Sequence, residues 1–415
     1  MSLSCFDLGE RMLSVSEAQR HLEGLVSVPL ATELCPLAEL PGRILAEAIH
    51  SPIDVPQNTN AAMDGIALAW PAPSAELALV GSVLAGSRAE RSLDAGEAVT
   101  ITTGAPLPRG ADTVIMQEQL IFPGEGRVGI TRSETVHRGQ HVRQAGEDVA
   151  RDSQALAAGT RLGPAQLGLL ASLGVTEARV HRRPRVAIFS SGDEVTAPGE
   201  PLPAAGIYDA NRYSLRGLLD GLGCEVIDLG ILPDDREAIA GALARAAEEA
   251  DMVITSGGVS VGRADWIKAA LGEVGELGFW RIAMRPGRPL ACGWLGEGRT
   301  PFFGLPGNPV AVMVTFLQFV QPVLRRLVGQ PDWQPRRLTA LAAEPLRSRA
   351  GRVDYLRGSY HSDRQGRLWV TPTGRQGSGI LTSMVLADCL IEVAAECEGV
   401  AEGEPVTLQL LNDFS

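Results

Sequence analysis

Three short glycine-bearing segments each follow a stretch that the sequence predicts to be a buried strand. They read "SSGDE" (190–194), "TSGGVSVG" (255–262) and "LPGNP" (305–309). Glycine lets backbone N–H groups approach a ligand closely, and a helix N-terminus behind such a loop adds about half a positive charge. One such loop is more often only a tight turn. Three such loops at one edge of a sheet favour an anion-binding site. The third loop contributes Pro306, Gly307 and Asn308 to it.

The glycine segments do not fit the two common nucleotide-binding motifs. No Gly-Lys-Ser/Thr follows at the spacing of a Walker A loop, and no segment has the dinucleotide-binding fingerprint. The sequence therefore indicates a different phosphate-bearing ligand.

Several carboxylates fall next to these segments: Asp193, Glu194, Asp234, Asp235 and Asp265. Bare carboxylates repel an anion, so we infer a divalent cation, Mg²⁺, that bridges them to phosphate oxygens. Helix capping explains Asp193 or Asp235 taken alone better than metal binding does. For Glu194 and Asp265 we prefer metal binding, and we keep Asp235 as a further candidate ligand.

Two arginines in "AMRPGRPL", Arg285 and Arg288, supply fixed positive charge near the same edge. Planar guanidinium groups suit phosphate and other oxyanions. The alternative is a solvated surface hairpin.

The elements that must position these residues alternate between strand and helix. Strands are predicted at "RVAIFSS", "CEVIDLG", "DMVITS" and "PFFGL", and helices at "NRYSLRGLLDGLG", "DDREAIAGALARAAEEA" and "VAVMVTFLQFVQPVLRRLV". Asn211 and Asn308 are predicted N-caps, Pro309 begins the last helix, and Gly223 lies just past the first. Such alternation predicts a mostly parallel sheet that binds ligands at the carboxyl ends of its strands.

The flanking sequence predicts a multidomain α/β plus β protein. A capping box at Ser14 and Glu17 opens a short helix. Short β-rich runs from 51 to 138 indicate an inserted β domain, and the region 1–50 together with 139–181 frames it. The central three-layer α/β domain spans 182–329, after a basic "HRRPR" linker, and a small β domain spans 334–411.

The composition excludes several classes of function. The 415 residues carry a net charge of −12, which argues against nucleic acid and anionic membranes as partners. Six cysteines without a CxxC pair indicate reduced thiols, mostly buried. The N-terminus lacks a signal-peptide pattern, and the longest apolar stretch, "VAVMVTFLQFV", is too short to span a bilayer. We expect a cytoplasmic protein.

Six motifs together resemble the molybdopterin molybdenumtransferase family, which includes bacterial MoeA and the gephyrin E domain. They are "AAMDGIAL", "TGAPLPRGADTVIMQE", "VRQAGEDV", "SSGDEV", "SGGVSVGRAD" and "LPGNPVAV", in order along nearly the whole chain. The resemblance implies an elongated homodimer of four-domain subunits, with 1–50 and 139–181 in dimerisation and an active site shared between protomers. It also implies that adenylylated molybdopterin and molybdate react with Mg²⁺ to give molybdenum cofactor and AMP. The molybdopterin adenylyltransferase and apo-molybdoenzymes are further implied partners.

The resemblance also implies roles for individual residues. Its catalytic acids match Asp64, Asp148, Glu194, Asp265 and either Asp234 or Asp235. Its substrate-binding positions match Thr103, Ser256, Gly257, Gly258, Ser260, Arg357 and Ser378.

The sequence departs from the family at three places. Arg285 and Arg288 replace the usual lysines, so they keep the charge but do not act as proton donors. Ile66 stands where an aromatic residue is common, and Thr100 where a basic one is. The competing enzyme is the adenylyltransferase, which needs only one α/β domain. The competing non-enzymatic reading is a pterin-binding scaffold, against which the complete acidic set argues.

Overall fold

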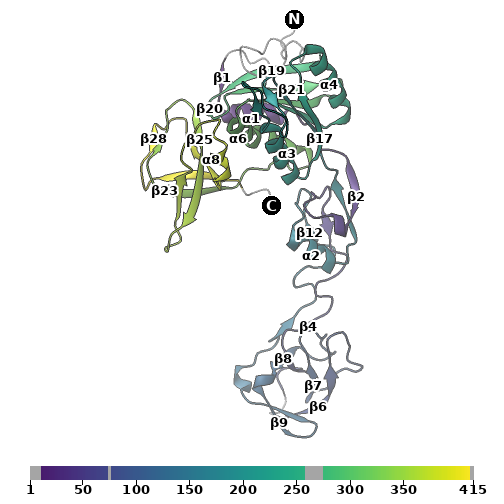
Figure 1. Ribbon diagram of the computed structural model, residues 1–415. Helices are drawn as coiled ribbons and strands as arrows, with labels where there is room; N and C mark the ends of the chain where they lie inside the picture. The colour runs from purple at the N-terminus through teal and green to yellow at the C-terminus, as the bar shows by residue number, and fades with distance from the viewer. Residues whose placement is uncertain (1–10, 73–75, 258–273, 412–415) are drawn as a thin grey trace. The chain divides into compact units, whose positions relative to one another are not determined.

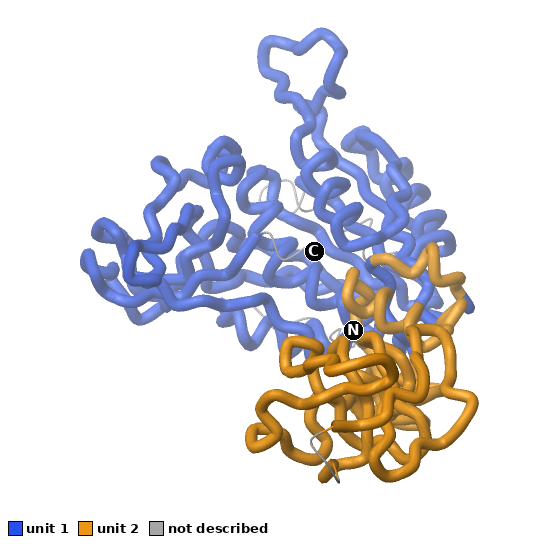
Figure 2. The backbone as a smooth tube through the Cα atoms, turned by 90° about the horizontal axis from the view of Figure 1, so that it is seen from below, with its two compact units in different colours: residues 1–34, 42–46, 179–415 blue, residues 35–41, 47–178 orange. Residues whose placement is uncertain are grey.

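Figure 1 shows a computed structural model of the chain, which describes residues 11–72, 76–257 and 274–411. The chain forms two compact units (Figure 2). Unit 1 comprises residues 1–34, 42–46 and 179–415, and unit 2 comprises 35–41 and 47–178. The predicted division into four domains is finer than this and remains a prediction.

A seven-stranded sheet lies at the centre of unit 1, in the order β1-β19-β21-β22-β18-β14-β17. Its strands are β1 (Met12–Leu13), β14 (Arg185–Ser191), β17 (Glu225–Leu232), β18 (Met252–Ser256), β19 (Gly275–Ile282), β21 (Pro289–Leu295) and β22 (Thr300–Leu305). The neighbours β22, β18, β14 and β17 are parallel, as predicted. Strand β21 runs antiparallel to β19 and β22, so the sheet is mixed at that side.

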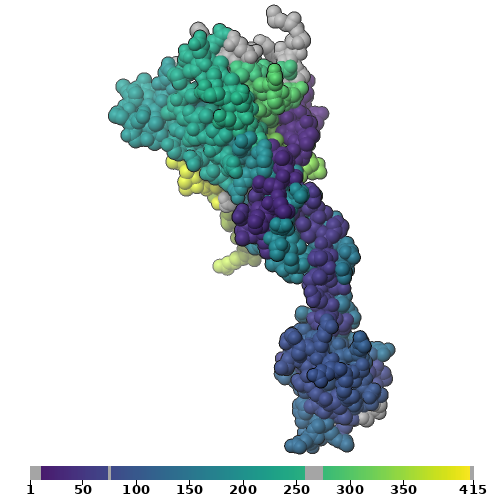
Figure 3. All heavy atoms as spheres, turned by 90° about the vertical axis from the view of Figure 1, so that its right-hand side faces the viewer, coloured from purple at the N-terminus to yellow at the C-terminus, as the bar shows by residue number. Residues whose placement is uncertain are grey.

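Helices cover both faces of this sheet, which confirms the predicted three-layer α/β domain. One face packs against α1 (Val15–Glu23), α3 (Asn211–Gly221), α6 (Pro309–Thr315) and α7 (Gln321–Leu327). The other face packs against α4 (Arg236–Glu249), which lies on the side of unit 1 turned toward the viewer in Figure 3. Each face thus has its own hydrophobic core.

The predicted helix ends are confirmed in part. The Ser14 hydroxyl accepts from the backbone of Glu17, whose carboxylate accepts from the backbone of Ser14 at 2.8 Å, so the capping box is present. Gly223 follows α3 with a φ of +75°, as a helix-ending glycine should. Asn211, however, is the first residue of α3 rather than its N-cap, a position that Ala210 holds. Its side chain instead contacts a neighbouring loop.

Residues 11–34 belong to unit 1, whereas residues 139–178 belong to unit 2. Strand β1 pairs with β19 at the edge of the sheet. Helix α1 buries Val15, Ala18 and Leu22 in the same core as the sheet. Burial of this apolar face fixes the segment to the α/β domain.

The helix after β22 is longer than the apolar run that marks it in the sequence. Helices α6 and α7 join through a π-helical turn, η4 (Phe316–Val320), into a continuous helix Pro309–Leu327. By length and apolarity alone this helix could cross a membrane. It is 83% buried inside the protein, however, as expected of a central core helix.

The C-terminal part of unit 1 is a small closed barrel, as predicted in outline. Its order is β25-β26-β23-β29-β27, and β27 pairs back to β25. The strands are β23 (Arg337–Ala342), β25 (Val353–Ser362), β26 (Leu368–Pro372), β27 (Cys389–Val393) and β29 (Pro405–Leu410). Strand β20 (Met284–Arg285) of the α/β domain pairs in parallel with β25, which joins the barrel to that domain.

Unit 2 is built on the predicted β domain. Its six-stranded sheet has the order β8-β5-β7-β6-β10-β9. The strands are β5 (Gly65–Leu68), β6 (Glu76–Val83), β7 (Glu97–Ile101), β8 (Thr113–Met116), β9 (Leu120–Gly124) and β10 (Arg127–Ile130). The rest of the unit includes β3 (Ile49–His50), β4 (Asn60–Ala61), β11 (Val142–Arg143), β12 (Gln154–Leu156) and α2 (Pro164–Ser172).

None of the five cysteines that the structure describes forms a disulfide, and four of them are buried. Burial raises the thiol pKa of Cys224 to about 12 and that of Cys292 well above its ordinary value. These thiols are packing groups, as the sequence indicated.

We predict that the core on the α4 face of the sheet depends on the fully buried Leu243. Leu243→Ala should lower the free energy of unfolding of unit 1 by about 2–5 kcal/mol, because the cavity it leaves refills only in part. Leu202→Ala, a matched change at a side chain that is 45% exposed, should stay within about 0.5 kcal/mol. Urea denaturation measures both, and equal losses would contradict the assignment of Leu243 to the core.

Candidate active site

The three glycine loops lie side by side because their strands are neighbours in the sheet. Ser190 of β14 pairs with Ser256 of β18, and Ser256 pairs with Leu305 of β22. The backbone N–H of Gly257 donates to the carbonyl of Leu305 at 3.2 Å. A Cβ on Gly257 would lie 3.0 Å from the carbonyl oxygen of Ser191, and its φ is +89°. Glycine is therefore required where the first two loops meet.

A buried polar network fixes the end of β14. The hydroxyl of Ser190 lies 3.2 Å from that of Ser256 and donates to Asp209 at 3.0 Å. Arg212 then pairs with Asp209 at 2.9 Å and with Asp228 at 2.7 Å. Ser256, 2% exposed, belongs to this network and not to the residues that line the cavity described below.

The third loop is held by helix α3. The side-chain amide of Asn211 donates to the carbonyl of Gly307 at 2.8 Å. Asn308 occupies the predicted N-cap position of α6, but its side chain makes no capping hydrogen bond. Its amide lines the cavity instead.

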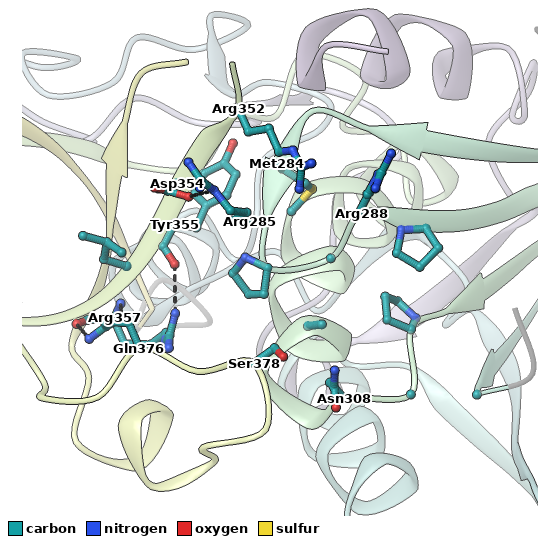
Figure 4. Close-up of a pocket in the computed structure, with 18 of the residues that line it drawn as sticks. Met284, Arg285, Arg288, Asn308, Arg352, Asp354, Tyr355, Arg357, Gln376 and Ser378 are labelled. Atoms are coloured by element: carbon teal, nitrogen blue, oxygen red, sulfur yellow. Dashed lines mark hydrogen bonds and ion pairs between the residues drawn. The ribbon is translucent and has the colours of Figure 1, made fainter. Parts of the chain in front are cut away.

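A cavity of about 1510 Å³ opens in unit 1 between these loops and the barrel (Figure 4). Seven arginines and five acids of the described chain line it. The arginines are Arg236, Arg285, Arg288, Arg347, Arg349, Arg352 and Arg357, and the acids are Asp193, Glu194, Asp234, Asp354 and Glu398. A net positive lining in a chain of net charge −12 indicates a site for an anion.

Arg357 is the most unusual of the cavity arginines. It is 1% exposed, and its guanidinium donates only to neutral oxygens: the Ser383 hydroxyl at 3.0 Å and the carbonyls of Tyr355 and Gly377. Burial lowers its pKa to about 10, so it stays charged at neutral pH. Among the described residues no carboxylate pairs with it. A buried charge of this kind is stabilised by an anionic ligand.

Arg285 and Arg288 both line the cavity, but only one is internally paired. Arg285 Nε lies 2.6 Å from Asp354. The Nε–H does not point along this line, so the contact is an ion pair rather than a hydrogen bond. Arg288 has no ion pair within the described ranges. Gly287 between them packs against α6, where a Cβ would lie 2.3 Å from the Thr315 hydroxyl.

The acids that follow the glycine loops in the sequence differ in whether they line the cavity. Glu194 and Asp234 line the cavity, as does Asp193. Asp235 does not line it. It is the N-cap of α4, and its carboxylate accepts from the backbone of Ala238 at 2.8 Å. The structure thus gives Asp235 the capping role.

The described acids fit a cation that keeps most of its water. No three His, Cys, Asp or Glu residues come together as a metal cage in the described segments. Mg²⁺ usually binds one or two carboxylates plus phosphate oxygens, and Glu194 and Asp234 both line the cavity. Asp265, Gly258 and Ser260 lie outside the described residues.

Three predicted site residues lie in unit 2. Asp64 accepts from the backbone N–H of Thr103 at 2.6 Å and from its hydroxyl at 2.8 Å. These hydrogen bonds lower the pKa of Asp64. Asp148 is exposed on the segment after β11. The pairing of Asp64 with Thr103 links two residues that the sequence proposed separately.

Sequence reasoning missed the arginines of the barrel except for Arg357. Arg347, Arg349 and Arg352 all line the cavity, and so does Gln376, whose side chain bonds both backbone groups of Arg357. The signal was present as a run of basic residues in "LRSRAGRVDYLRG" (346–358). This run also fits the alternation of a strand with one solvent-exposed face, where arginines are common, so it did not by itself indicate a binding site.

The sequence matches three family profiles that together define a class of molybdenum cofactor biosynthesis proteins. They are the "MoeA N-terminal region (domain I and II)" over residues 13–174, the "probable molybdopterin binding domain" over 187–326 and the "MoeA C-terminal region (domain IV)" over 339–411. The cavity lies between the parts of unit 1 that match the second and third profiles.

Relatives and solved structures agree with this class along the whole chain. A molybdopterin molybdenumtransferase of Haemophilus influenzae is 43% identical over 97% of this chain and 99% of its own length. Molybdopterin molybdenumtransferase 2 of Mycobacterium tuberculosis is 34% identical over 94% of this chain and 98% of its own. The crystal structure of the molybdopterin biosynthesis protein MoeA from Pyrococcus horikoshii superposes with a TM-score of 0.82 at 30% identity, covering 96% of this chain and all of that one. The chain belongs to the molybdopterin molybdenumtransferase family.

We predict that the Thr103 hydroxyl helps to keep Asp64 ionised. Thr103→Val removes one of two donors to the carboxylate, so the pKa of Asp64 should rise toward its ordinary value while the backbone donor limits the change. Thr103→Ser keeps the hydroxyl and should leave the pKa low. NMR titration of the Asp64 carboxyl carbon measures the shift, and a pKa unchanged in the Val variant would refute the contact.

Proposed function

We propose that this protein inserts molybdate into adenylylated molybdopterin and releases AMP, with Mg²⁺ as its cofactor, and that it acts in the cytoplasm. Its family and the names of its relatives support the reaction class. The observation that carries the proposal is the buried, uncompensated charge of Arg357 in an arginine-rich cavity of an acidic protein.

The cavity residues supply binding and orientation for such a substrate. The glycine loops bring backbone close to the phosphoanhydride: Gly307 and Asn308 line the wall as N–H donors, whereas the N–H of Gly257 is used by the carbonyl of Leu305. Arg357 offers a desolvated guanidinium for a compact oxyanion such as molybdate, and Ser378 lines the cavity beside it. Arg288 adds a charge that is not neutralised within the described residues.

Glu194 and Asp234 would hold the Mg²⁺, together with Asp265, which lies outside the described residues. When bound, the ion would neutralise charge on the phosphoanhydride as its P–O bond breaks and AMP leaves. We omit Asp235 from this set because its carboxylate caps α4.

We further propose a homodimer in which Asp64 and Asp148 of one protomer face the cavity of its partner. Its support is the division of the proposed site residues between the two units, with Asp64 and Asp148 exposed in unit 2. The adenylyltransferase that supplies the substrate and the apo-enzymes that receive the cofactor are the further proposed partners.

An assay of AMP release tests the reaction. The purified protein is incubated with adenylylated molybdopterin, Mg²⁺ and molybdate, and AMP is followed over time. Molybdate-dependent AMP release supports the proposal. Formation of adenylylated molybdopterin from ATP and molybdopterin would instead make the protein an adenylyltransferase. Tight substrate binding with no turnover would make it a scaffold.

We predict that Glu194→Gln lowers turnover by roughly 10²-fold or more, because it removes a charge that holds the metal while keeping the shape of the side chain. Higher Mg²⁺ should restore part of the activity in a Mg²⁺ titration of AMP release. Asp235→Asn is the control, since asparagine also caps helices well and should leave turnover unchanged. Wild-type turnover of Glu194→Gln at low Mg²⁺ would rule out the metal role.

We predict that two inactive variants complement each other if the site is shared between protomers. Asp64→Asn and Arg357→Gln should each be inactive alone. Mixed and reassorted, they should regain roughly a quarter of the wild-type sites, because half of the dimers are mixed and each mixed dimer has one intact site. A mixture as inactive as its components would place both residues of a site in the same protomer.

A further inference from the structure

Three arginines on one segment of the barrel line the cavity. Arg347, Arg349 and Arg352 lie on residues 346–352, which we call the arginine arm. Their side chains make no hydrogen bond or ion pair with any other residue that the structure describes. In Figure 4, Arg352 is drawn in the upper part of the view, and Arg357 and Gln376 are drawn at its lower left.

The backbone of the arm directs its arginines away from the barrel core. Leu346 is buried, Arg347 is exposed, Ser348 is half-buried and Arg349 is exposed, which is the alternation of an extended strand. The hydroxyl of Ser348 donates to Asp354 at 2.6 Å. The arginines on the other face therefore project from a fixed backbone.

Asp354, the acid that contacts the backbone and Ser348 side of the arm, is already engaged. Asp354 is 6% exposed and holds both the Ser348 hydroxyl and Arg285. Arg285 in turn donates to the carbonyl oxygen of Arg349. This arrangement uses the charge of Asp354 to hold the backbone of the arm and leaves the guanidinium groups of the arm unpaired.

The arm is anchored at both ends. Leu346 pairs with Val400 in the two-stranded β24 (Leu346–Arg347) and β28 (Gly399–Val400) ladder. Gly351 N–H donates to Ala395 at 2.7 Å, and Val353 N–H donates to Ala283 of the α/β domain at 3.0 Å. The backbone of the arm is therefore fixed at both ends. Its three arginines face the cavity without a side-chain partner among the described residues, as expected of a segment that binds an anion.

The cavity thus offers two different environments for anions. Arg357 is buried and gives a small, dry site, whereas the arm is open and carries several guanidinium groups. We propose that the arginine arm binds the phosphate groups of the substrate, a phosphoanhydride or phosphomonoester, at a subsite separate from the oxyanion at Arg357. This inference rests on the proposed function, and it makes the arm a specificity-determining element for phosphate-bearing pterins.

Binding of two simple anions to the full chain tests the inference. Inorganic pyrophosphate probes the arm and molybdate probes Arg357, both by isothermal titration calorimetry at one ionic strength. The double variant Arg349→Gln/Arg352→Gln should lower pyrophosphate affinity by about tenfold or more, because two charge-assisted contacts are lost, and leave molybdate affinity within about twofold. Arg357→Gln should show the reverse pattern.

Arg364→Gln is the matched control, since Arg364 is an exposed arginine of the same barrel that does not line the cavity. Circular dichroism and thermal unfolding establish that each variant is folded. The proposal is overturned if the wild type does not bind pyrophosphate, if the double variant binds it normally, or if Arg364→Gln weakens it equally. These binding measurements do not depend on AMP release. A result that contradicts phosphate binding by the arm can therefore be distinguished from one that contradicts the proposed reaction.

Discussion

The site depends on how closely three backbones approach one another at the carboxyl edge of the sheet. Gly257 adopts a φ of +89° and lies against the carbonyl of Ser191 on one side and that of Leu305 on the other. A side chain there would push the loops after β14 and β18 apart. Because β14, β18 and β22 are adjacent parallel strands, this one contact aligns all three loops and the acids that follow them.

The charges of the cavity come from two different parts of unit 1. The α/β domain contributes Glu194 and Asp234 from its strand ends, and the barrel contributes Arg357 and the arginine arm. Contacts that hold the parts together include the pairing of β20 with β25 and the hydrogen bond from the N–H of Val310 to the carbonyl of Ser378 at 3.0 Å. The position of the barrel at the start of α6 therefore brings Arg357 and the arginine arm to the same cavity as Glu194 and Asp234.

Much of this arrangement could be predicted from the sequence, because strand and helix periods and capping residues are local signals. The parallel strands, the capping box at Ser14 and the clustering of the glycine loops follow from such signals. The relation of Asp64 and Asp148 to the cavity remains a prediction.

The structure differs from the sequence-based predictions at positions whose role is set by contacts between residues far apart in the sequence. Asn211 bonds to Gly307 on a distant loop, which no helix pattern reveals. The sequence did not predict that the arginine arm lines the cavity, because this depends on which face of the barrel packs against the α/β domain. Residues 11–34 join unit 1 through one strand pairing and one apolar helix face, and the pairing partner lies over 260 positions away in the sequence.

The unpaired arginines also bear on how long a ligand stays bound. A long side chain without an internal partner samples many rotamers, and fixing one arginine costs up to about 2 kcal/mol of conformational entropy. Each ligand that the arm grips must offset this cost, whereas the neutral acceptors around Arg357 have already fixed that side chain. Arg357 is thus held in place before a ligand binds, whereas the side chains of the arm become ordered only when a ligand binds. This difference favours rapid release of a phosphate-bearing product over its retention.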